Sequence, residues 1–208
     1  MPSTTLEALG LSKSFGGPPL FSGLSFVAEK GLIAVTGRNG SGKTTLLKIL
    51  AGLARASGGS VRVRRGAAEL AGRELQMTLG WAGPDLAFYE DFTAIENLRF
   101  FRRAAGAASG ERELVERLEA VGLAPAAGQR VGEFSTGMTQ RLRIAFALLF
   151  DSPLLLLDEP LAGLDSEGRE RVLGIVAGKR RAGAVVLASN DPRDFASPEQ
   201  EIRLGGSL

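Results

Sequence analysis

The 208-residue sequence contains neither cysteine nor histidine. Disulfide bonds are therefore excluded, and so are zinc sites and acid–base chemistry by an imidazole. Lysine and arginine (25) nearly balance aspartate and glutamate (23), which gives a formal net charge of +2. A charge this small does not indicate binding to nucleic acid or to an anionic membrane surface. We expect no nucleic-acid partner.

Long apolar runs are also missing. The longest, such as residues 144–150, are far short of the roughly 18–20 residues that a membrane helix needs. The N-terminus has neither the basic start nor the apolar segment of a secretory signal. Hydrophobic residues make up 44% and charged residues 23%, as in ordinary globular domains. We expect a cytoplasmic protein, so another chain would have to cross any membrane at which it works.

The most informative segment that is present is glycine-rich and lies at residues 37–44. It follows a short apolar stretch and precedes apolar residues at helical spacing: Leu46, Leu47, Ile49, Leu50 and Leu53. A strand, a glycine-rich loop and a helix N-terminus in this order bind phosphate, because the glycines let backbone N–H groups turn toward one centre. Lys43 would reach the β- and γ-phosphates and Thr44 would hold Mg²⁺. The other residues expected to bind the nucleotide are Gly37, Asn39, Gly40, Ser41, Gly42 and Thr45.

Strand-like and helical segments alternate along the rest of the chain. Strand patterns occur at residues 6–9, 24–28, 60–65, 77–82, 154–157, 184–188 and 201–204. Residues 92–150 have a helical pattern rich in alanine, arginine, glutamate and leucine, and a helix is expected at 166–181. Such alternation predicts a parallel sheet with helices on both faces, interrupted by a helical insert.

A second motif follows the strand at 154–157, which is apolar on both faces and ends in Asp158-Glu159-Pro160. Ligands of open α/β sheets bind at the carboxyl ends of the strands, where these acids fall. Asp158 is suited to bind Mg²⁺ opposite Thr44. Glu159 can polarise a water molecule for in-line attack on the γ-phosphate. We therefore expect Glu159 and Lys43 to be catalytic.

A third motif, Phe134-Ser135-Thr136-Gly137-Met138-Thr139-Gln140-Arg141, opens a helix expected to run to about residue 150. With the two other motifs it resembles the ATP-binding subunit of ABC transporters over nearly the whole chain. The family signature is Leu-Ser-Gly-Gly-Gln, of which Ser135 and Gly137 are kept. The resemblance implies an α/β fold: a P-loop NTPase core with a mostly parallel sheet, an N-terminal antiparallel β-subdomain and an inserted α-helical subdomain. Residues 1–208 would form one domain, with the core at 1–91 and 151–208 and the helical subdomain at about 92–150.

The same resemblance implies ATP hydrolysis and a set of partners. ATP would lie between the phosphate loop of one protomer and Ser135 and Gly137 of another, in a homodimer or with a paired ATPase subunit. Phe15 stands where the family stacks an aromatic ring on adenine, and Asp165 belongs to a segment similar to the D-loop. The chain would act on a transmembrane permease subunit, as a peripheral protein on the inner face of the cell membrane.

The sequence departs from the family at two positions near the γ-phosphate. Pro84 stands where the family has a glutamine, with Asp85 beside it as an alternative oxygen ligand for the metal. Asn190 replaces the switch histidine. An asparagine amide can still donate to a phosphate oxygen, but a neutral bond in place of a charge-assisted one costs about 1 kcal/mol. We expect a functional but slow ATPase with Asn190 in the catalytic site.

Two alternatives stay open at this point: a soluble ABC ATPase of a non-transport assembly, and a regulatory nucleotide-binding module with little turnover. Six aromatic residues at positions 81–101 predict either a docking groove for the membrane subunit or the core of the helical subdomain. The sequence of residues 20–26 is similar to the corresponding segment in the branch of this family that serves haem export in cytochrome c maturation. The transported substrate cannot be read from this chain.

Overall fold

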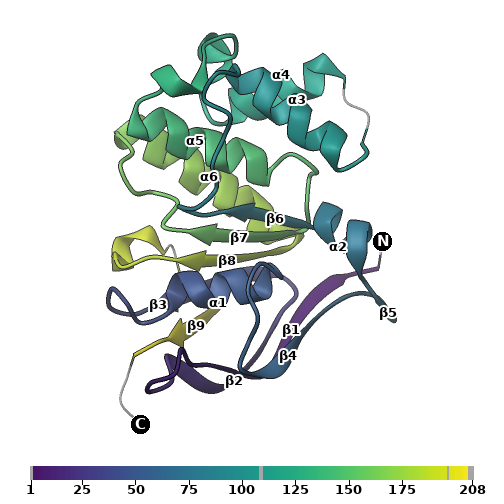
Figure 1. The fold of residues 1–208 in the computed structure, drawn as a ribbon, viewed down its shortest axis with the longest axis vertical. Helices are drawn as coiled ribbons and strands as arrows, with labels where there is room; N and C mark the ends of the chain where they lie inside the picture. The colour runs from purple at the N-terminus through teal and green to yellow at the C-terminus, as the bar shows by residue number, and fades with distance from the viewer. Residues whose placement is uncertain (1, 108–109, 196, 206–208) are drawn as a thin grey trace.

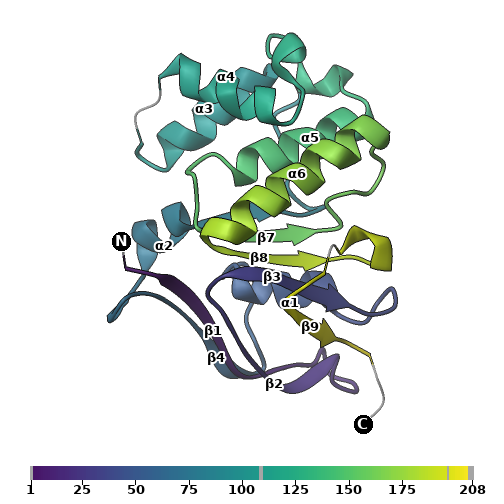
Figure 2. The same ribbon diagram turned by 180° about the vertical axis from the view of Figure 1, so that it is seen from behind.

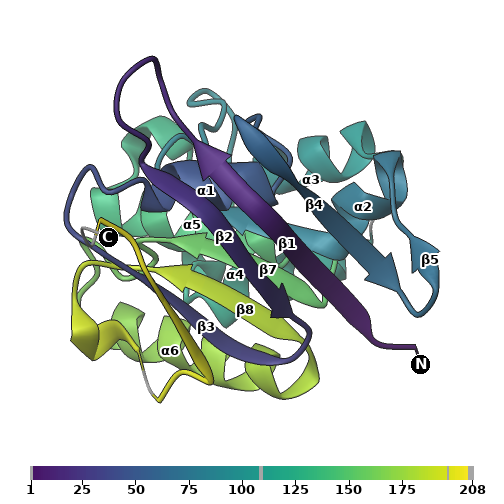
Figure 3. The same ribbon diagram turned by 90° about the horizontal axis from the view of Figure 1, so that it is seen from below.

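In the computed structural model, which describes residues 2–107, 110–195 and 197–205, two β-sheets lie on either side of one helix (Figure 1). The first sheet is antiparallel, in the order β2-β1-β4-β5. Its strands are β1 (Thr4–Lys13), β2 (Phe21–Ala28), β4 (Gly58–Arg65) and β5 (Ala68–Glu69). It forms the outer layer beneath the rest of the molecule (Figure 3).

The second sheet is parallel, in the order β6-β7-β8-β3-β9. Its strands are β3 (Gly31–Thr36), β6 (Leu79–Ala82), β7 (Leu154–Asp158), β8 (Ala184–Ala188) and β9 (Gln200–Arg203). Helices α5 (Thr136–Ala147) and α6 (Ser166–Ala182) cover one face of this sheet (Figure 2). Helix α1 (Lys43–Leu50) covers the other face and separates the two sheets.

A helical layer lies beyond α5 and α6. It contains α3 (Ala94–Ala104) and α4 (Glu111–Ala120), while α2 (Gly72–Thr78) lies at the edge near β6 (Figure 1). Three 3₁₀ turns complete the described elements: η1 (Ala124–Ala126), η2 (Val131–Glu133) and η3 (Pro192–Asp194). The predicted α/β fold, with a parallel core, an antiparallel β-subdomain and a helical insert, is confirmed.

The alternation of side chains along β7 explains why this strand is apolar throughout. Leu155 and Leu157 belong to the core under α5 and α6. Leu154 and Leu156 belong to the second core, which lies between the two sheets and includes α1. A central parallel strand is buried on both faces, so every position must be apolar until the strand ends at Asp158.

Three expected boundaries are wrong. Met77 and Thr78 belong to α2 rather than to a strand, and the Thr78 hydroxyl donates to the Glu74 carbonyl one helical turn earlier, 2.7 Å away. Helix α1 ends at Leu50, because Gly52 adopts a left-handed φ of 73°, and Leu53 beyond it is 61% exposed. Helix α5 ends at Ala147, not near residue 150.

Close packing of α5 on β6 requires a glycine at position 80. A β-carbon there would lie 2.1 Å from the carbonyl oxygen of Ala147. We expect Gly80→Ala to lower the free energy of unfolding by about 2–3 kcal/mol, because the helix must move away from the sheet. Gly174→Ala on the exposed side of α6, where a β-carbon meets nothing within 4 Å, should raise it by about 0.5–1 kcal/mol. Urea unfolding of both variants checks this, and equal stabilities would contradict it.

Candidate functional site

The glycine-rich loop connects β3 to α1 at the carboxyl edge of the parallel sheet. Gly37 has a φ of 148°, and a β-carbon there would lie 2.6 Å from both the Leu204 carbonyl oxygen and Ser41 Oγ. Gly42 precedes α1 with a φ of 99°, and no described side chain caps this helix. The first four N–H groups of a helix lack intrahelical partners, so the start of α1 is suited to bind phosphate. Ser41 Oγ is also buried without a hydrogen-bond partner among the described residues.

A pocket of about 360 Å³ opens beside this loop. It is formed by the loop, by the start of α1 and by the segments that follow β7 and β8, and its lining residues are Leu20, Asn39, Gly40, Gly42, Lys43, Thr44, Thr45, Glu159, Ala162 and Asn190. Residues expected from three separate parts of the sequence therefore meet in one place. Ser41 and Asp158 lie immediately next to lining residues in the chain, and the Gly37 carbonyl accepts from the lining residue Lys43.

Lys43 is only 7% exposed and is held by several oxygen atoms. Its Nζ donates to the Gly37 carbonyl at 2.9 Å and to Oδ1 of Asn190, and it lies 3.9 Å from Oε1 of Glu159. The amide of Asn190 in turn donates to Oδ1 of Asn39. Asn190 thus connects the end of β8 to Lys43 through its amide oxygen and to Asn39 of the phosphate loop through its amide nitrogen.

Asp158, the last residue of β7, is the most deeply buried acid of the site, at 2% exposure. Neither of its carboxylate oxygens has a hydrogen-bond partner of ordinary geometry among the described residues. Burial raises the pKa of Asp158, and the nearby Thr44 hydroxyl and the charge of Lys43 act in the opposite direction. A buried carboxylate that lacks partners beside a threonine hydroxyl is the hard oxygen set that Mg²⁺ takes. These residues fit a magnesium ion.

Glu159 has a φ of 48°, a left-handed conformation that is uncommon for a residue with a side chain. Its N–H donates to the Ala188 carbonyl at 2.8 Å, and its own carbonyl accepts from Nε2 of Gln140 at 3.1 Å. On its carboxylate, Oε2 lies 3.3 Å from Ser189 Oγ. Burial raises the pKa of Glu159, opposed by the positive charge of Lys43. Its backbone is therefore fixed from two sides while its carboxylate faces the pocket.

Gln140 and Arg143 of α5 were not expected from the sequence. Arg143 donates to the carbonyls of Pro84 and Leu86, at 3.0 and 3.2 Å, and to Oε1 of Gln140 at 3.1 Å. The two side chains join the segment after β6 to the backbone of Glu159. Gln140 and Arg143 lie three residues apart and so share one face of the helix, and this spacing is the signal that could have indicated their contact.

Phe15 and Asp85 are predicted residues that do not line the pocket of the described chain. Phe15 is 73% exposed, with Lys13 Nζ 4.5 Å from the centre of its ring. Asp85 forms an ion pair with Lys48, and its side chain is 61% exposed. The charge of Asp85 acts on the pKa of Asp158, but only as a minor contribution. In this structure the Phe15 ring is therefore exposed and the Asp85 carboxylate is paired with Lys48, and neither side chain contributes to the pocket.

The third motif lies at the N-terminus of α5. Ser135 is exposed and caps the helix through its side chain. A β-carbon on Gly137 would lie 3.1 Å from the Gly163 carbonyl, so α5 approaches the segment after Glu159 closely. In that segment Asp165 caps α6 by accepting the N–H of Gly168 at 2.8 Å. None of these three predicted residues lines the 360 Å³ pocket of the described chain.

A parallel sheet, a glycine-rich loop at a helix N-terminus and a buried acid at a neighbouring strand end define a P-loop nucleotide-binding protein. The family model described as "ABC transporter" matches residues 21–162. The chain belongs to the ABC transporter family, as an ATP-binding subunit with ATPase activity.

Curated relatives cover nearly the whole chain. It is 38% identical to the cytochrome c biogenesis ATP-binding export protein CcmA of Nitrobacter winogradskyi, over 97% of this chain and 98% of that protein. It is 39% identical to the protein of the same name from Rhizobium meliloti, over 92% and 93%. The linearmycin resistance ATP-binding protein LnrL of Bacillus subtilis is 31% identical, over 88% of this chain and 60% of its own length.

Solved structures share the fold. A dimeric ATP-binding cassette in a post-hydrolysis state with ADP and phosphate superposes with a TM-score of 0.82 at 23% identity, over 96% of this chain and 94% of that one. A bacterial Atm1-family ABC exporter with ATP bound gives the same TM-score at 19% identity, over 98% and 37%. Within the described ranges, no helix of this chain has the length and apolarity needed to cross a bilayer.

Proposed function

We propose that the chain is the ATP-hydrolysing subunit of an exporter of the cytochrome c biogenesis type, driving transport through a separate membrane subunit. Support for the branch comes from the relatives of that name, which match this chain over nearly their whole length. Support for hydrolysis comes from one observation: the pocket that brings Lys43 and Thr44 together with Glu159. The protein would then be peripheral on the inner face of the cell membrane.

Each pocket residue has a role in this proposal. The N-terminal amides of α1 and Lys43 bind the phosphates, and Lys43 exchanges its contacts with Gly37 and Asn190 for phosphate oxygens. Thr44 and Asp158 would hold Mg²⁺, which when bound neutralises part of the phosphate charge. Glu159 orients and polarises the attacking water, because its carboxylate faces the pocket. The Asn190 amide, whose N–H donates to Oδ1 of Asn39 in this structure, would donate to a phosphate oxygen.

The remaining predicted residues require other contacts. Phe15 is exposed enough to stack on adenine. Ser135 and Gly137, outside the pocket of their own chain, would bind the nucleotide held by a second copy or by a paired ATPase subunit. The exposed start of α5 supports this arrangement, since a helix N-terminus attracts the γ-phosphate. Asp165 would lie at the same dimer interface.

Turnover is proposed to be slow. The neutral amide of Asn190 replaces a side chain that can carry charge, and Pro84 offers only a backbone carbonyl, which already accepts from Arg143. The same two residues favour the second candidate, a regulatory nucleotide-binding module with little turnover. Phosphate release above the buffer background, lost in Glu159→Gln, supports the ATPase. Release at background, unchanged by that substitution, favours the regulatory module.

The membrane partner would bind an exposed aromatic surface made of Tyr89, Phe92 and Phe100. These side chains are 49, 39 and 41% exposed, and the Tyr89 and Phe100 rings lie 4.9 Å apart. A groove of about 490 Å³ runs beside Phe92 and Phe100 and is also lined by Glu96, Arg99 and Arg103. The apolar face of an amphipathic helix of the membrane subunit would suit this surface. Phe88 and Phe101 instead pack on the core.

We expect Phe100→Glu to move the protein from the membrane fraction to the soluble fraction, because a charge there prevents burial of the aromatic surface. Nucleotide binding should not change. Val27→Glu on β2, which replaces another apolar side chain at 54% exposure, is the matched control and should stay with the membrane. Both are measured by co-purification from the native host. Recovery of the unmodified protein only from the soluble fraction, with no membrane protein attached, counts against transport and favours the soluble assembly.

A further inference from the structure

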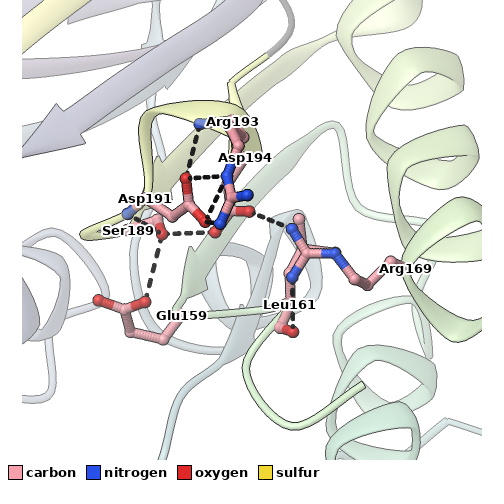
Figure 4. A network of polar contacts seen from close by, with 7 residues as sticks. All are labelled: Glu159, Leu161, Arg169, Ser189, Asp191, Arg193 and Asp194. Carbon is pink, nitrogen blue, oxygen red and sulfur yellow. Dashed lines mark hydrogen bonds and ion pairs between the residues drawn. The ribbon is translucent and has the colours of Figure 1, made fainter. Parts of the chain in front are cut away.

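A buried serine lies between two carboxylates next to the proposed catalytic acid (Figure 4). Ser189, directly after β8, is 1% exposed. Its Oγ lies 3.3 Å from Oε2 of Glu159 and 2.5 Å from Oδ2 of Asp194, and it accepts the N–H of Asp191 at 3.1 Å. Within the described chain, the hydrogen-bond partners of this hydroxyl are thus the proposed catalytic acid, Asp191 before the η3 turn and Asp194 at its end.

Asp194 connects the serine to α6. It is 4% exposed, and its Oδ1 accepts from Nη2 of Arg169 at 2.7 Å. Arg169 also donates through Nη1 to the carbonyl of Leu161, two residues after Glu159 in the chain, at 3.3 Å. The network therefore begins at the carboxylate of Glu159 and ends at the carbonyl of Leu161, as the dashed lines in Figure 4 show.

The turn that carries Asp194 is itself fixed. Arg193 donates to both carboxylate oxygens of Asp191, at 2.9 and 2.7 Å, and these hydrogen bonds lower the pKa of Asp191 to about 2. Asp191 accepts the N–H of Arg193 as well, which closes the start of η3. The N–H of Asp191 that points at Ser189 Oγ is thereby held in place.

A serine hydroxyl has one hydrogen, so it donates to one of the two carboxylates at a time. Because the contact with Asp194 is the shorter one, the hydroxyl donates its hydrogen bond to Asp194 in this structure. Asp194 also has Arg169 as a charged partner, so it can release the hydroxyl without being left unpaired. Glu159 has no such second partner on Oε2 within the described chain, and its Oε1 lies 3.9 Å from Lys43 Nζ, at the pocket.

We propose that Ser189 is a positioning residue for Glu159. Held by the Asp194–Arg169 pair, its hydroxyl turns to donate to Oε2 of Glu159 and thereby leaves Oε1 facing the nucleotide pocket. The carboxylate is then fixed in the orientation in which it can accept a proton from the attacking water. This inference rests on the proposed catalytic role of Glu159. It adds a residue that does not itself line the 360 Å³ pocket.

The test compares Ser189→Ala with Ser152→Ala in the full chain. Ser152 is equally buried at 1% exposure and donates one hydrogen bond, to the Met77 carbonyl at 3.2 Å, away from the pocket. Ser189→Ala should lower kcat about tenfold, the value of one hydrogen bond to a charged group. The KM for ATP and the affinity for a non-hydrolysable ATP analogue should stay unchanged, and Ser152→Ala should keep its kcat. The Tm of both variants is measured alongside.

An unchanged kcat in Ser189→Ala, an equal fall in Ser152→Ala or a parallel loss of nucleotide affinity would overturn the proposal. If Ser189→Ala does not fold, Ser189→Thr and Ser189→Val decide, because these side chains have the same shape and differ in the hydroxyl. The threonine variant should be about tenfold more active, and equal activities overturn the proposal. Hydrolysis that survives Glu159→Gln would instead show that the proposed catalytic assignment has failed, whatever Ser189→Ala does.

Discussion

Glu159→Gln is expected to reduce ATP hydrolysis by at least about 100-fold, the usual contribution of a positioned general base. The amide keeps the shape of the carboxylate but cannot accept a proton from water. Nucleotide binding should remain, because Lys43, Thr44 and the N-terminus of α1 are unchanged. Hydrolysis would no longer break up the ATP-bound dimer. We therefore also expect this variant to accumulate as a stable dimer when ATP is added. Phosphate release and light scattering with and without ATP measure the two effects.

Glu170→Gln is the matched control for this substitution. Glu170 is an exposed residue of α6, so the same chemical change there should alter neither hydrolysis nor association. A Glu159→Gln variant that hydrolyses ATP at the normal rate would remove Glu159 from the reaction. A variant that binds ATP but stays monomeric at every protein concentration would argue against a nucleotide shared between two copies.

Lys43→Ala should weaken ATP binding by at least about 30-fold, because a buried cation that contacts phosphate oxygens contributes roughly 2–5 kcal/mol. The loss has a second physical reason. Lys43 is 7% exposed and is the cation next to Oε1 of Glu159 and Oδ1 of Asn190, so its removal leaves uncompensated negative charge in the pocket. Titration with a fluorescent ATP analogue measures the affinity.

Lys48→Ala provides the comparison on the same helix. Lys48 pairs with the exposed Asp85 rather than with the pocket residues, so its loss should leave ATP affinity within about twofold of the original, as for surface ion pairs. Equal weakening by the two substitutions would mean that Lys43 acts only through the general positive charge of α1.

Local patterns determined a large part of this protein. The phosphate loop was predictable because its glycines, lysine and threonine are contiguous and their conformations depend on neighbouring residues. The buried strand before Asp158 was predictable because both its faces are apolar. Element ends were less certain, since Met77 and Thr78 suit a strand by pattern and yet complete the last turn of α2.

The tertiary structure alone decided which side chains meet around Glu159. Strand β8 lies between β7 and β3, and its last residue, Ala188, pairs with Asp158 on one side and with Val35 on the other. This order places Ser189 against Glu159 and Asn190 against Lys43. No periodicity in the sequence encodes strand order, because the neighbours of a strand are selected by packing of the whole sheet. The sequence therefore determined the reactive groups, and the sheet order determined their partners.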